Sequence, residues 1–152
     1  MHPPSDFSLE RRFYEHRADL EQIVNMMEQD VHMQRIASDF TRNSDWDSEI
    51  LKPRQISEQR WDQYREMFRR ADVPMGIQRG VYPDDIEIMV WAAGLAIAGD
   101  SLSYLHCGKP AKILDRYLPC IERKESGEFE NGDGFISYKR IEGDWYLYEL
   151  SN

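Results

Sequence analysis

The chain has 152 residues, 41% of them hydrophobic and 12% aromatic, which is enough apolar surface for one domain with a real core. Its 28 acidic and 19 basic residues give a formal net charge of -9, which disfavours binding to nucleic acid or anionic membranes and makes a basic protein the easier partner. No stretch reaches the roughly 18 consecutive apolar residues of a membrane-spanning helix. We therefore expect a single domain over residues 1–152, with no nucleic-acid binding and no membrane span; the oligomeric state is not indicated.

The compartment and the state of the thiols are predicted from the start of the chain and the cysteine count. Residues 1–12 are polar and charged, without the apolar segment of a secretory signal, so a cytoplasmic location is the simplest interpretation. An export signal on the native gene stays open. Cys107 and Cys120 are too few for a disulfide scaffold, and although they could pair, we favour two free thiols.

An amphipathic helix is predicted first along the chain, with Ser8 as its N-cap. Residues 35–40 are then predicted as a short strand or an extended link, and residues 43–53, rich in Asp, Ser and Asn, as a surface loop. The apolar residues of the helix recur at steps of three, four and seven positions and so share one face: Leu9, Phe13, Leu20, Ile23, Val24, Met27 and Val31.

A second helix has clearer boundaries. Ser57 is its predicted N-cap, and Ile56 and Trp61 occupy the positions of a hydrophobic staple. Pro74 and Gly76 follow the apolar stripe, so we expect the helix to end near residue 71. The stripe consists of Trp61, Tyr64, Phe68 and Ala71.

Beyond residue 76 the apolar residues recur at every second position, which predicts strands. Residues 82–85 are predicted as a turn and residues 86–98 as a long strand, with a bulge or bend at Gly94. Gly99 and Asp100 suggest a tight hairpin leading into residues 101–107.

The C-terminal part is predicted to be a short helix, a loop and a hairpin. Pro110 suits the first position of a helix over residues 111–118, and the charged, glycine-bearing residues 122–134 suggest a loop. Residues 135–140 and 145–150 form the predicted hairpin. The fold class is therefore α+β: an antiparallel sheet of four to five strands with two main helices packed on one face.

Three segments resemble a family of small uncharacterised bacterial proteins, some of them lipoprotein-like. These are residues 57–65, residues 93–95 with 98–101, and the aromatic hairpin of residues 140–148. Family members often carry Ser-Lys-Gly in the central hairpin, where this chain has Ser-Leu-Ser at residues 101–103. The resemblance covers roughly residues 30–150. It implies a fold and carries no activity, cofactor or catalytic residue.

Candidate catalytic residues are few. His16 lies at the edge of the first apolar stripe beside acidic residues, although packing is the commoner role for such a histidine. His106 and Cys107 cannot act as base and nucleophile together, since neighbours on a strand point to opposite faces. The chain lacks the ligand spacing of a metal site and the glycine pattern of a phosphate-binding loop, so we expect no metal and no cofactor.

The strongest candidate for binding is an acidic segment next to an aromatic hairpin, because aromatic side chains with a charged rim are typical of protein-binding surfaces. A non-enzymatic binding protein, of the inhibitor or immunity type and directed at a basic protein, is the favoured hypothesis. The alternative is a small hydrolase or ligand-binding protein with a pocket between helices and sheet. The residues of the first hypothesis are Glu128, Glu130, Asp133, Trp145, Tyr146 and Tyr148.

Overall fold

The computed structural model describes residues 2–43, 56–80, 84–95, 98–108, 120 and 125–151. Within them, two helices are combined with one antiparallel sheet of eight strands, in the order β2-β1-β3-β4-β5-β8-β7-β6. The elements are α1 (Asp6–Gln29), β1 (Met33–Ile36), β2 (Thr41–Asn43), α2 (Glu58–Ala71), β3 (Ile77–Arg79), β4 (Ile86–Leu95), β5 (Ala98–His106), β6 (Ser126–Asn131), β7 (Gly134–Glu142) and β8 (Trp145–Ser151).

The predicted fold class is confirmed, but four to five strands was too few. The strands β1, β2 and β3 have only three or four residues each, too few to show a clear alternation of apolar and polar positions. No helix among the described residues is long and apolar enough to cross a membrane.

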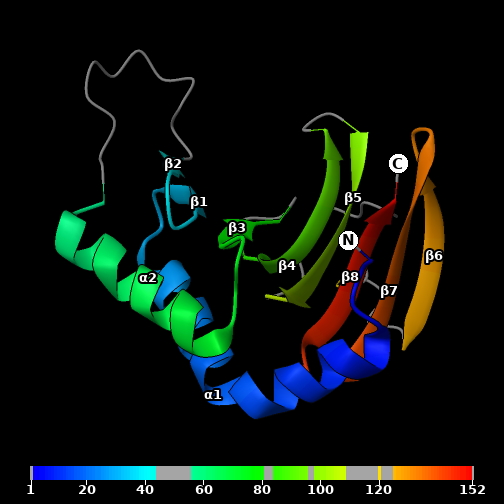
Figure 1. Ribbon diagram of the computed structural model, residues 1–152, viewed down its shortest axis with the longest axis horizontal. Helices are drawn as coiled ribbons and strands as arrows, with labels where there is room; N and C mark the ends of the chain where they lie inside the picture. Colours follow the sequence, from blue (N-terminus) through cyan, green and yellow to red (C-terminus); the bar gives the residue numbers. More distant parts are fainter. Residues whose placement is uncertain are drawn as a thin grey trace.

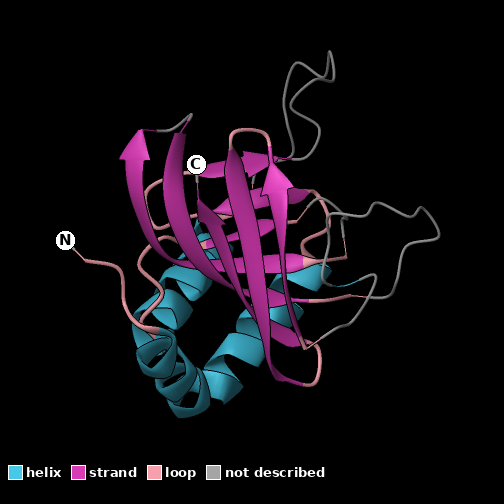
Figure 2. Cartoon of the chain, turned by 90° about the vertical axis from the view of Figure 1, so that its right-hand side faces the viewer, coloured by secondary structure: helices cyan, strands magenta, loops and turns pink. Residues whose placement is uncertain are grey.

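Both helices lie on the same side of the sheet, and the far ends of β5 to β8 extend beyond them (Figures 1 and 2). We call this side the helix face and the opposite side the outer face. The main core lies between the helices and the helix face, and includes Phe13, Tyr64, Ile88 and Trp145. A smaller cluster lies on the outer face, around Tyr138 and Tyr146 of β7 and β8 and the two cysteines.

The first helix begins earlier and ends sooner than predicted. Ser5 is the N-cap, and its side chain accepts a hydrogen bond from the backbone N–H of Ser8, so Ser8 lies within the first turn. Both serines precede the apolar stripe and are suitable N-cap residues, but the N-cap is Ser5. Val31 lies beyond the helix and is 60% exposed, whereas the other six residues of the predicted stripe are buried.

The second helix is confirmed at both ends. The Ser57 side chain accepts a hydrogen bond from the backbone N–H of Arg60, and Ile56 and Trp61 pack against the main core. The helix ends at Ala71, where Asp72 adopts a left-handed conformation with a φ of 54°. Local capping signals therefore sufficed to place this element.

The central hairpin is formed by the predicted strands, but Gly99 and Asp100 are not its turn. Gly94 pairs with Gly99 and Leu95 with Ala98, so Gly99 and Asp100 belong to β5 rather than to a turn. The irregularity in β4 falls between Met89 and Trp91, ahead of Gly94. A Cβ at Gly99 would lie 2.4 Å from the carbonyl oxygen of Ala93, so this glycine allows the close approach of the two backbones.

The C-terminal hairpin is confirmed and gains a third strand. Part of the predicted loop at residues 122–134 is the strand β6, which pairs with β7 along its whole length. Gly127 was taken as a loop signal, yet a Cβ there would lie 2.6 Å from the Tyr138 hydroxyl oxygen. Its lack of a side chain makes room for the Tyr138 ring on the neighbouring strand.

Cys107 and Cys120 form a disulfide, so the prediction of two free thiols was wrong. Their Cα atoms are 5.3 Å apart, although 13 positions separate them in the sequence. Both are buried in the outer-face cluster with Tyr138 and Tyr146. The bond thus fixes Cys120 to Cys107 on the outer face of the sheet.

Several predictions fall outside the described residues. They are the helix at residues 111–118, nearly all of the loop at residues 43–53, and the first half of the turn at residues 82–85.

Reduction of the disulfide is expected to destabilise the protein. For a closed loop of this length, cross-linking lowers the entropy of the unfolded chain, and its loss costs about 3 kcal/mol. Urea unfolding followed by tryptophan fluorescence, with and without a phosphine reductant, measures this. The C107S/C120S double variant serves as control, because its stability should be low and indifferent to the reductant. Equal stability of the oxidised and reduced native protein would contradict the expectation.

Candidate functional site

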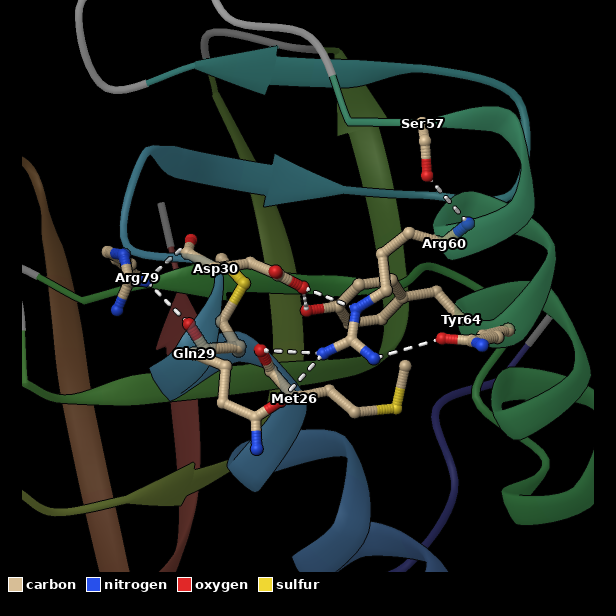
Figure 3. A network of polar contacts seen from close by, with 9 residues as sticks. Met26, Gln29, Asp30, Ser57, Arg60, Tyr64 and Arg79 are labelled. Carbon is tan, nitrogen blue, oxygen red and sulfur yellow. Dashed lines mark hydrogen bonds and ion pairs between the residues drawn. The ribbon is translucent and has the colours of Figure 1, made fainter.

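The densest polar cluster lies at the end of α1 (Figure 3). The carboxylate oxygen Oδ2 of Asp30 accepts hydrogen bonds from the Tyr64 hydroxyl at 2.6 Å and from Nε of Arg60 at 2.8 Å. The same Arg60 guanidinium donates to the backbone carbonyl of Met26 and to the side-chain oxygen of Gln29. The cluster therefore joins α2 to the last turn of α1.

A second arginine completes this cluster from the sheet. Arg79, on β3, donates to the backbone carbonyls of Met27 at 2.6 Å, Asp30 at 3.0 Å and Met33 at 2.9 Å. The last turn of α1 has no basic residue of its own. The two guanidiniums thus supply, from distant parts of the chain, the positive charge that favours a helix C-terminus.

The geometry of this cluster is that of a structural site. Tyr64 is 0% exposed, and its pKa is raised, first by burial and then by its hydrogen bond to Asp30. A phenol in that state does not release its proton near neutral pH. The donors of Arg60 and Arg79 are directed at groups of the protein itself. The cluster holds α1 in place.

His106 and Cys107 are separated as predicted. The His106 ring packs edge-on against Trp145 at a centroid distance of 4.8 Å, on the helix face. Cys107 lies in the outer-face cluster, where its sulfur is bonded to that of Cys120. The pair cannot supply a base and a nucleophile, because the sheet lies between them and the thiol is oxidised.

His16 lines neither of two hollows formed by described residues. One hollow, of about 170 Å³, lies between the start of α1 and the sheet, and a wider groove of about 620 Å³ runs between α1 and α2. The groove is lined mainly by polar side chains of the helices, including Gln22, Gln63 and Glu66. A role for His16 as base in a pocket gains no support from this geometry.

The predicted binding residues divide between interior and surface. Trp145 is 3% and Tyr146 is 1% exposed, on opposite faces of the sheet, so neither side chain forms an outer surface. Tyr148 is half-buried against the outer-face cluster. The acidic members are all exposed: Glu128 and Glu130 on β6, and Asp133 in the turn that follows.

The glutamates of β6 come together with residues that the sequence interpretation missed. In the strand register, Glu128 lies opposite Ser137, which in turn lies opposite Glu149. The next row along the sheet joins Glu130 to Phe135, whose ring is 48% exposed. Residues paired across neighbouring strands point to the same face, so all five side chains belong to the helix face.

This group lies where the helix face extends beyond the helices (Figure 1). Its orientation follows from Lys139, two residues along β7 from Ser137, whose ammonium group forms an ion pair of 2.6 Å with Glu10 of α1. We call the group Glu128, Glu130, Phe135, Ser137 and Glu149 the acidic face.

The smaller hollow opens beside the acidic face. Its apolar floor is formed by Leu9, Leu102 and Leu147, and its polar wall includes Asp6 and Glu149. Lys139 also lines it, but Glu10 neutralises that charge. The remaining carboxylates make the hollow negative, so its chemistry suits a cationic side chain with an aliphatic stem.

A row of polar groups also crosses the outer face. Glu87 of β4 accepts hydrogen bonds from the Ser103 hydroxyl at 2.7 Å and from the Gln78 amide at 2.9 Å. Burial, and then the Glu87 charge, raise the pKa of Tyr148 beside this row, so that phenol stays protonated. The polar groups of this row form hydrogen bonds with one another and stabilise the sheet.

The described residues include no group of three or more His, Cys, Asp or Glu arranged to hold a metal ion. Comparison with protein-family models, with curated proteins and with solved structures finds no match for this chain. The resemblance to a bacterial family therefore stays an interpretation of short sequence segments.

Removing the Asp30 carboxylate should destabilise the protein strongly. In Asp30→Ala the buried Tyr64 hydroxyl and the Arg60 guanidinium lose their acceptor, which costs about 3 kcal/mol, whereas Tyr64→Phe removes one donor and costs about 1 kcal/mol. Chemical denaturation of the two variants and of the double variant gives the coupling energy. The exposed Asp39→Ala is the control and should change stability by less than about 0.5 kcal/mol. Additive effects of the two substitutions would contradict a shared cluster.

Protonation of His106 should destabilise the fold in mild acid. Burial lowers the pKa of His106 below its ordinary value of 6.5, and its Nδ1 makes no hydrogen bond within the described residues. As the pH falls below 6.5, His106 gains a proton in the unfolded chain while it stays neutral in the folded chain. The free energy of unfolding therefore decreases until the pH reaches the lowered pKa of the folded state. The free energy of unfolding should fall less steeply between about pH 7 and pH 5 in His106→Gln than in the native protein. Identical slopes would refute this.

Proposed function

We propose that this chain is a non-enzymatic binding protein, of the inhibitor or immunity type, whose acidic face receives a basic protein. The observation that carries the proposal is the row Glu128, Ser137 and Glu149, which lies with the exposed ring of Phe135 on a part of the sheet not covered by the helices. An exposed aromatic ring beside carboxylates matches a partner that presents basic side chains with apolar stems.

Electrostatics supports the same partner class. The net charge of -9 attracts a basic protein from a distance, and carboxylates at the contact then favour the correct orientation. Phe135 offers apolar contact area beside Glu130, at the end of this group. Such a surface gains specificity from charge and affinity from the ring.

The alternative of a small hydrolase or ligand-binding protein has less support. The hollow between α1 and the sheet measures about 170 Å³, below the roughly 300 Å³ at which small-molecule sites begin. It is large enough for one side chain of a partner. The wider groove of about 620 Å³ exceeds that size, but it lies between the two helices rather than between helices and sheet, and its lining is mainly polar. The candidate base His106 and the candidate nucleophile Cys107 lie on opposite faces of the sheet, which argues against a hydrolase that uses this pair.

The disulfide adds a proposal about the compartment. Disulfides persist in oxidising surroundings and are rare in a reducing cytosol. The bond between Cys107 and Cys120 therefore favours action in an oxidising compartment over the cytoplasmic location first expected. A toxin inhibitor or surface-binding protein would suit that setting.

Charge reversal of the acidic face should abolish binding of a basic probe. With ¹⁵N-labelled protein and a synthetic lysine-rich peptide at low salt, chemical-shift changes should concentrate on Glu128, Phe135, Ser137 and Glu149. The triple variant Glu128→Lys/Glu130→Lys/Glu149→Lys should weaken the peptide's affinity at least a hundredfold, because attraction becomes repulsion. High salt should weaken binding to the native protein.

A matched control separates a site from general charge. Glu28→Lys/Asp39→Lys/Glu58→Lys changes the net charge by the same amount at exposed positions on α1, the β1–β2 turn and α2. This variant should keep most of the affinity. Equal losses in the two triple variants, or shift changes spread over the whole surface, would refute the proposed site.

A further inference from the structure

Among the residues that the structure describes, the strand β6 forms one edge of the sheet. It pairs with β7, and the sheet order ends with it. The backbone N–H and C=O groups of alternate residues in an edge strand point away from the sheet and can pair with another strand. Edges of this kind are often protected by proline, lysine or a bulge, and β6 contains neither proline nor lysine and shows no register shift against β7.

The two faces of β6 differ in chemistry. Glu128 and Glu130 point to the helix face, as part of the acidic face. Between them, Phe129 points to the outer face, where its ring contacts that of Tyr138 at a centroid distance of 5.4 Å. A strand added along this edge would therefore meet carboxylates on one side and a half-buried aromatic ring on the other.

The charges select against a second copy of the chain. Pairing of two β6 strands would bring the glutamates of both copies onto neighbouring strands, and like charges across strands are destabilising. A basic strand gains from the same residues. Charge complementarity therefore favours a heterologous strand with a basic residue at every second position.

We propose that the partner binds by strand addition: an extended segment of a basic protein pairs with the free edge of β6. Its basic side chains lie over Glu128 and Glu130, and its intervening apolar side chains pack against Phe129. Main-chain hydrogen bonds supply affinity in this mode, and alternate side chains supply specificity. The inference rests on the proposed function, because it names how the acidic face engages its partner.

The geometry of the β6–β7 turn provides a specific variant. Residues 132 and 133 form a two-residue turn, in which Gly132 has a φ of 62°. Since the pair flanking such a turn is hydrogen-bonded, the backbone groups of the next residue, Glu130, face away from β7. Glu130→Pro therefore blocks strand addition while leaving the β6–β7 ladder intact. Glu130→Gln removes the same charge and keeps the N–H, so the two variants are matched.

The experiment uses the full chain and a capped heptapeptide of alternating lysine and valine. Binding should slow hydrogen exchange of the outward-facing amides of residues 126–131. The same peptide with every interior nitrogen methylated keeps its charge but cannot pair as a strand, and it should bind at least tenfold more weakly. Glu130→Pro should lose at least tenfold more affinity than Glu130→Gln, and urea unfolding checks that both variants are folded.

The outcomes separate this inference from the function on which it rests. Equal binding of the methylated and unmethylated peptides, still sensitive to charge reversal of the acidic face, would overturn strand addition and leave the acidic binding site standing. If charge reversal of the acidic face left the peptide's affinity unchanged, both the strand-addition inference and the proposed binding site would be overturned. Concentration-dependent dimerisation of the native chain that Glu130→Pro abolishes would overturn the choice of occupant, because β6 would then pair with a second copy.

Discussion

The position of α1 depends on which residues bind the backbone carbonyls at its C-terminal end. The last turn of α1 contains no basic residue, so Arg60 of α2 and Arg79 of β3 bind its carbonyls from elsewhere, and Asp30 balances the first of these charges. Three elements thereby meet at one point. Because a helix of 24 residues is about 36 Å long, an anchor at one end controls where the other end lies.

That other end decides which part of the sheet stays open. The Tyr104 hydroxyl donates to the backbone carbonyl of Leu9 at 2.7 Å, and Lys139 pairs with Glu10, so the start of α1 is tied to β5 and β7. The start of α1 is therefore held near Lys139, and the far ends of β5 to β8 extend beyond the helices (Figure 1). The acidic face is therefore a consequence of where α1 begins, in addition to the charges on β6 and β8.

Local signals predicted the helices, and non-local pairing decided the rest. The staple of Ile56 and Trp61 around Ser57 lies within six residues and was sufficient. Gly127 was misinterpreted as a loop residue because the glycine is required by the Tyr138 ring on the neighbouring strand, which the local sequence does not show. The disulfide was missed because the sequence between Cys107 and Cys120 does not indicate that the two residues lie close together. Among the site residues, exposed glutamates were found from composition, whereas Phe135 and Glu149 join them only through strand register.

The aromatic residues show why composition alone misplaces a binding surface. Trp145 and Tyr146 looked suitable for a partner, yet alternation places them in two different cores, and the exposed ring on β7 is that of Phe135. A sheet covered on both sides near β8 needs aromatic side chains in both directions. Its uncovered end needs protection from self-association instead, and glutamates on an edge strand provide it. In the proposed binding mode, the same carboxylates that disfavour pairing between copies also favour pairing with a basic strand.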